Sequence, residues 1–167
     1  MIDVYLAVLD EGYYEVNEAL IGLADDHVWK RPANRLLSIG EVAGHVAYWL
    51  PMRLTAERDE HDPAAAGCRV SGPLIDPRFR YYPTILATGP SEEQRAMTAA
   101  QVCSELLRVH RESAAYVKAL NPDLDSHPPA WPQTYRSYLS YAAFHVAYHA
   151  GQNYCARHLL GETTPDN

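Results

Sequence analysis

The sequence predicts an all-α protein, a four-helix bundle with one long connection between its second and third helices. Apolar residues recur at helical spacing in four long segments. Residues suited to capping a helix precede three of these segments. No stretch shows the convincing alternation of a half-buried strand. A chain of 167 residues can bury one core, so we expect a single domain spanning residues 1–167.

The first predicted helix covers residues 2 to about 24. Its apolar positions fit helical spacing better than strand alternation, and they are Val4, Leu6, Val8, Leu9, Tyr13, Val16, Leu20 and Leu23. The pattern breaks between Asp25 and Pro32. Within this break, we expect Trp29 to fold back and cover one end of the core.

The second predicted helix begins at Ser38, and Glu41 three residues later completes the spacing of a capping box. His45 follows on the apolar face of this helix, whose neighbouring members are Val42, Val46 and Trp49. Glu41 lies one turn before His45. It can reach a cation bound by His45 or act only as the cap, and the cap is the favoured interpretation.

The connection between the second and third helices, residues 59–90, has a different character. It is rich in proline, has few periodic apolar positions, and its prolines are Pro63, Pro73, Pro77, Pro83 and Pro90. The aromatic residues Phe79, Tyr81 and Tyr82 predict that it is anchored on the bundle. Connections of this length are usually functional or mobile. Both a cover for an active site and a plain surface loop remain open.

The third predicted helix opens at residues 90–94, where Ser91 and Gln94 have capping-box spacing, and it runs to about Leu120. His110 lies on this helix beside Arg111 and Glu112, so we expect it to face solvent. The last predicted helix starts after the N-cap Thr134 and ends at residues 160–161, with glycine just beyond the end.

His145 and His149 are the first indication of chemistry, because residues four apart on a helix point from the same face. Two imidazoles so placed can share one divalent metal ion, although the pair alone is weak evidence. His45 on the second helix can supply a third ligand, as facing helices do in metal-binding bundles. Three imidazoles form an open site of the catalytic type, suited to Zn²⁺, Ni²⁺ or Fe²⁺. Val146 stands where a zinc protease of the H-E-x-x-H type has its glutamate.

The composition limits the partners that we expect. A net charge of −7 gives no electrostatic support for binding nucleic acid or an anionic membrane. We find no signal-peptide pattern and no apolar run of the roughly 18 residues needed to span a bilayer. Three cysteines, at positions 68, 103 and 155, are too far apart for a zinc knuckle and are expected as reduced thiols. These features predict a cytoplasmic protein.

Three motifs together resemble the DinB/YfiT-like metalloenzymes, and the resemblance spans essentially the whole chain. The motifs are Trp-x-x-Pro (Trp29, Pro32), Gly-His-x-x-x-Trp (Gly44, His45, Trp49) and His-x-x-x-His-x-Gly-Gln (His145, His149, Gly151, Gln152). The resemblance implies a four-helix bundle, one divalent metal on the three histidines and often a homodimer. Characterised members include thiol transferases, isomerases and hydrolases of small molecules. This chain departs from the commoner motif by carrying Tyr148 and Ala150 around His149, which removes a basic residue that can contact an anionic substrate.

The leading functional prediction is a metal-dependent enzyme that transfers a low-molecular-weight thiol to a small-molecule substrate through a metal-bound thiolate. The alternatives are a hydrolase that uses metal-bound water and a non-catalytic bundle in which the metal braces the fold or a ligand pocket. Tyr148 and Gln152 are the candidate catalytic residues, because they lie within one turn of His149 and can orient a substrate or an imidazole. For Tyr148, packing in the core is an equally good explanation.

Overall fold

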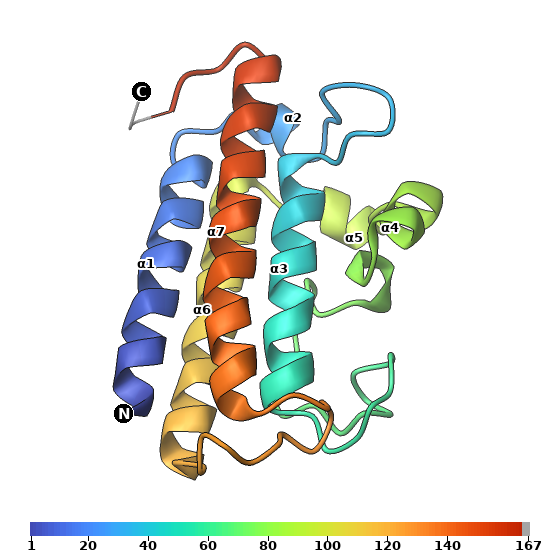
Figure 1. Ribbon diagram of the computed structural model, residues 1–167. Helices are drawn as coiled ribbons and strands as arrows, with labels where there is room; N and C mark the ends of the chain where they lie inside the picture. Colours follow the sequence, from blue (N-terminus) through green and yellow to red (C-terminus); the bar gives the residue numbers. More distant parts are fainter. Residues whose placement is uncertain (165–167) are drawn as a thin grey trace.

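The computed structural model describes residues 1–164 (Figure 1), and every regular element in this range is helical, with no strand. This confirms the predicted all-α class. The helices are α1 (Ile2–Leu20), α2 (Asp25–Val28), α3 (Ile39–Leu54), η1 (Pro77–Phe79, a 3₁₀ turn), α4 (Tyr82–Thr88), α5 (Glu92–Arg95), α6 (Ala99–Leu120) and α7 (Tyr135–Leu159).

The four long helices α1, α3, α6 and α7 pack against one another around one core. Helix α7 contacts both α1 and α3, and α6 contacts the same two helices from behind in the view of Figure 1. Each helix buries one apolar stripe, because its apolar residues recur every three or four positions. Fully buried members include Leu9, Val16, Ile39, Leu106, Val109 and Leu139. Among residues 1–164, no helix is both long enough and apolar enough to cross a membrane.

The predicted caps of α3 and α7 are present. The Ser38 hydroxyl accepts a hydrogen bond from the Glu41 backbone N–H at 3.2 Å, and Glu41 Oε2 accepts one from the Ser38 N–H at 2.8 Å. The remaining capacity of the Glu41 carboxylate is taken by Arg31, with Nη2 2.6 Å from Oε1. Glu41 therefore caps α3, as the favoured interpretation predicted, and it also forms an ion pair with Arg31 that the sequence did not indicate. Thr134 caps α7 through its hydroxyl.

The start of the third long helix was predicted wrongly. Ser91 and Gln94 do form a capping box, but the helix that it opens, α5, ends after one turn at Arg95. A second capping box, made by Thr98 and Gln101, then opens α6. Trp29 stabilises the interruption between α5 and α6, because its indole N–H donates to the Met97 carbonyl at 3.0 Å. Trp29 itself is partly buried against the core, as expected.

The prediction that His110 faces solvent is also wrong, since His110 is only 4% exposed. Its ring stacks on Tyr13 of α1 with centroids 3.9 Å apart, and Nε2 contacts Asp10 at 2.5 Å. His110 lies four residues after buried Leu106, on the stripe of α6 that packs against α1. His110 is therefore buried because it lies on the apolar stripe of α6, although its neighbours in the sequence, Arg111 and Glu112, are polar.

Residues 59–90 are anchored on α3 through aromatic side chains. The Phe79 ring is fully buried and packs directly on the backbone of α3 at Gly44, where an added Cβ would meet the ring at 2.7 Å. The Trp49 indole N–H donates to the Arg80 carbonyl at 2.7 Å. In Figure 1, α4 and α5 lie on the side of α3 away from α1. The connection therefore brings η1 and the start of α4 to the face of α3 that carries His45.

Replacing Gly44 with alanine is expected to destabilise the protein by about 1–3 kcal/mol, because the new methyl group overlaps a ring held in a packed core. Urea unfolding of Gly44→Ala and wild type measures this difference. Gly151→Ala is the matched control. An added Cβ at Gly151 meets nothing within 4 Å, so this helix-interior change should stabilise by about 0.5–1 kcal/mol. Equal stability of Gly44→Ala and wild type would contradict the close packing of Phe79.

Candidate metal centre

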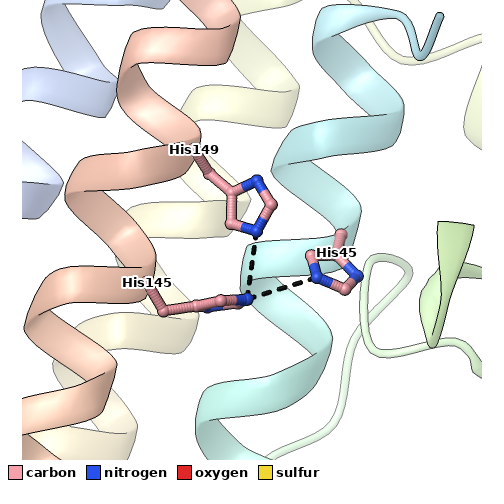
Figure 2. Close-up of side chains that lie close together, drawn as sticks. All are labelled: His45, His145 and His149. Atoms are coloured by element: carbon pink, nitrogen blue, oxygen red, sulfur yellow. Dashed lines mark hydrogen bonds between the residues drawn. The ribbon is translucent and has the colours of Figure 1, made fainter.

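Three histidine side chains converge between α3 and α7 (Figure 2). His45 comes from α3, and His145 and His149 come from successive turns of α7. The Nε2 atom of His145 lies 3.2 Å from Nε2 of His45 and 3.0 Å from Nε2 of His149. One nitrogen from each ring lies within 4.8 Å of the others. The structure thus brings together the three histidines that the sequence singled out, and no carboxylate or thiol joins them among residues 1–164.

Each ring is placed by the helix that carries it. His45 is 7% exposed on the face of α3 that meets α7, and His149 is 3% exposed on the facing side of α7. His145, one turn earlier on α7, is partly exposed. The cluster is therefore buried from most sides and open on the side of His145.

Two of the three rings have their tautomer fixed from outside the cluster. Nδ1 of His45 lies 2.8 Å from the Phe79 carbonyl oxygen, and Nδ1 of His149 lies 2.7 Å from Oε1 of Gln152. Both oxygens can only accept hydrogen bonds, so each Nδ1 carries the proton. The Nε2 lone pairs of His45 and His149 consequently point into the cluster, as required of metal ligands.

The electrostatic environment keeps these imidazoles neutral. Burial lowers the pKa of His145 to about 3, with His149 and His45 adding to the effect, and burial with His45 nearby lowers the pKa of His149 to about 4. Burial also lowers the pKa of His45. At neutral pH, all three rings are uncharged, and an uncharged imidazole is the form that ligates metal.

The donor set fits a divalent cation. A tetrahedral zinc ion with Zn–N bonds of about 2.0–2.1 Å separates two ligand nitrogens by about 3.3 Å. Two of the three separations, 3.0 and 3.2 Å, are close to this value, and the third lies within 4.8 Å. Without a cation, the N–H at His145 Nε2 can form a well-directed hydrogen bond to the lone pair of either His45 or His149, but not to both. One cation satisfies all three lone pairs at once.

Tyr148 and Gln152, the predicted catalytic residues, lie beside the cluster. Gln152 Nε2 donates to the Tyr148 hydroxyl oxygen at 3.1 Å, while Gln152 Oε1 accepts from His149. Tyr148 is 54% exposed, which excludes core packing as the explanation for it. Gln152 holds the His149 ring, and Tyr148 places a hydroxyl at the edge of the site.

Sequence reasoning missed two partners that come from the connection. The Phe79 carbonyl orients His45, and the Tyr82 hydroxyl donates to Gln152 Oε1, the same oxygen that orients His149. The aromatic cluster of residues 79–82 was the available signal, but it indicated anchoring only. A backbone carbonyl leaves no trace in a side-chain pattern.

Replacing Gln152 with leucine is expected to weaken Zn²⁺ affinity about 10–100-fold, because the Nδ1–H of His149 loses its acceptor and the ring loses its fixed orientation. Competition with a chromophoric chelator measures the affinity. Tyr148→Phe is the matched control, since it removes only the hydroxyl that accepts from the Gln152 amide nitrogen and keeps the ring that packs on His149. We expect less than about a threefold change for it, and equal losses in both variants would disprove the orienting role of Gln152.

Comparison with known families agrees with the motifs. A family model described as the DinB superfamily matches residues 9–153, a range that begins within α1 and includes His45, His145 and His149. No curated protein and no solved structure matches the chain. The family match covers well over half of the sequence in one continuous stretch. The chain therefore belongs to the DinB superfamily.

Proposed function

We propose that this protein is a divalent-metal-dependent enzyme, built on a DinB-type four-helix bundle, that transfers a low-molecular-weight thiol to a small-molecule substrate. In this proposal, His45, His145 and His149 hold one cation. The observation that carries the proposal is the convergence of three Nε2 atoms from neutral rings, two of which are oriented through Nδ1.

The number and type of ligands support an active site over a structural one. Structural zinc sites are closed by four protein ligands, usually including cysteine, whereas catalytic sites have three and leave a position open. The cluster holds three histidines and no fourth donor among residues 1–164. A bound cation supplies Lewis acidity, which lowers the pKa of a thiol or a water molecule beside it.

The imidazole-only cluster is compatible with a thiol as the nucleophile, as it is with a metal-bound water that ionises near neutral pH. Metalloproteases of the H-E-x-x-H type use a glutamate as the general base for water. Here the cluster contains only imidazoles within the described range, and position 146 is a buried valine. A thiol needs no such base, because coordination deprotonates sulfur outright.

Tyr148 is the residue best placed to contact the substrate. Its oxygen accepts a hydrogen bond from Gln152, so its own O–H proton is left to donate. The side chain is exposed, and its ring lies against that of His149 with the centroids 5.0 Å apart. In our proposal, this hydroxyl stabilises negative charge that develops on the substrate.

Titration of Co²⁺-loaded protein with 2-mercaptoethanol tests the proposal. We expect the visible absorption spectrum of the cobalt to change on adding the thiol and to remain unchanged on adding ethylene glycol, its oxygen analogue. His145→Ala should lose the response, because this ring contacts both of the others.

Two other outcomes would contradict thiol transfer. A spectrum that changes with pH but not with thiol would point to hydrolysis. A spectrum insensitive to both, combined with a large loss of thermal stability on chelation, would identify a metal that only braces the fold.

A further inference from the structure

A row of side chains on α3 leads from the metal centre into a pocket. His45, Trp49 and Arg53 are spaced four residues apart, so they lie on one face of the helix. The pocket has a volume of about 300 Å³, with His45 and His145 at one end and Arg53 at the other. Its remaining wall is aromatic and consists of Trp49, Tyr81, Trp131, Tyr138 and Tyr141.

The guanidinium of Arg53 is held rigidly in this pocket. Arg53 is only 6% exposed, and its Cζ lies 4.3 Å from the ring centroid of Trp49 and 3.7 Å from that of Trp131. Two indole rings therefore lie against the guanidinium and attract its charge. Among the pocket-lining residues, Arg53 is a permanent cation and none is a carboxylate.

One edge of the guanidinium is paired and the other is not. Nη1 donates to Asp59 Oδ1 at 3.0 Å and to the Ala130 carbonyl at 3.1 Å. Nε is buried without a partner, and neither hydrogen bond of the Arg53 side chain uses Nη2. A buried N–H without a partner is costly. The Nε–Nη2 edge is one that binds a carboxylate through two parallel hydrogen bonds.

A second buried arginine shows that this arrangement differs from an ordinary structural one. Arg157 uses both terminal nitrogens within the fold. Nη1 donates to the carbonyls of Ala19 and Ile21, and Nη2 donates to Glu162 and to the Thr163 carbonyl. Nε is buried without a partner in both arginines, so the difference lies at Nη2, which the fold pairs in Arg157 and leaves out of both Arg53 hydrogen bonds.

We propose that this pocket binds a substrate with an aromatic or apolar body and a carboxylate, and that the carboxylate pairs with Nε and Nη2 of Arg53. The proposal rests on the proposed function and names the substrate class for the same site. The body of the substrate lies among the aromatic rings, and its reacting end faces His45 and His145. Because Nε is buried, pairing it with the second carboxylate oxygen requires the pocket wall to move, whereas pairing with Nη2 does not depend on Nε.

The spacing sets the length of the substrate. Residues 45 and 53 are separated by eight residues, or about 12 Å along the helix axis. The Arg53 side chain leans back toward the start of the helix, which shortens this span. The carboxylate therefore sits several bonds from the reacting atom and does not itself occupy the metal centre.

Binding of 3-phenylpropionate and its neutral amide, 3-phenylpropionamide, tests the proposal. Intrinsic fluorescence reports binding, because Trp49 and Trp131 flank Arg53. Both probes are measured on metal-free and on Zn²⁺-loaded protein. We expect the acid to bind at least about tenfold more tightly than the amide in both forms, since hydrogen bonds to charged groups are the stronger ones.

Asp59→Asn is the decisive variant, because Asp59 is exposed on the surface and its carboxylate competes for the same guanidinium. Its removal should tighten binding of the acid about two- to fivefold and leave binding of the amide unchanged. Arg53→Lys, checked for an unaltered melting temperature, should weaken binding of the acid about tenfold because lysine lacks the planar fork.

Three results would overturn the proposal: equal binding of acid and amide, no effect of Asp59→Asn, or binding of the acid only when Zn²⁺ is present. The last result would mean that the carboxylate coordinates the metal. Failure of the protein to bind metal would contradict the proposed function and leave the measurement on metal-free protein intact, so the two failures are distinguishable.

Discussion

The contact of three neutral imidazoles at the interface of α3 and α7 is the constraint around which the rest of the molecule is arranged. His145 Nε2 lies 3.2 Å from the lone pair of His45 and 3.0 Å from that of His149, and its one proton can point fully at only one of them. Burial disfavours a second proton on the cluster. A cation resolves the conflict, because it accepts all three lone pairs. In our proposal, the same burial that makes the cluster unfavourable when it is empty makes it selective for metal over protons.

Both the long helices and the connection at residues 59–90 contribute to the geometry of this cluster. Helices α3 and α7 set the positions of the three rings. Residues 59–90 orient His45 directly through the Phe79 carbonyl, and they support His149 indirectly through Tyr82, which donates to Gln152. Gly44 is what lets the connection approach so closely, since any side chain there would overlap the Phe79 ring. Packing of the connection is thus coupled to the direction in which the His45 lone pair points.

The sequence predicted the parts of the fold that depend on periodicity and capping. The helical class, the caps at Ser38 and Thr134 and the pairing of His145 with His149 follow from residue spacing. The proximity of His45 to this pair was expected from the bundle architecture and the family resemblance. The break between α5 and α6 was not predicted. Two capping boxes seven residues apart both form, and Trp29 binds the Met97 carbonyl between them, a tertiary contact that the local pattern does not reveal. The burial of His110 could have been predicted from its distance of four residues from Leu106. The unpaired Nε and Nη2 of Arg53 could not have been predicted, because they result from tertiary contacts in which Asp59 and the Ala130 carbonyl bind only Nη1.

Metal content is the measurement that tests the central claim most directly. Untagged protein purified without nickel resin is analysed by mass spectrometry for transition metals, together with His45→Ala, His149→Ala and His158→Ala. His158 is the matched control because it lies exposed on the same helix as His149. The account predicts about one equivalent of divalent metal in wild type and His158→Ala, and none in the other two variants. Folded wild-type protein that neither contains nor takes up metal, or full occupancy in His45→Ala and His149→Ala, would contradict it.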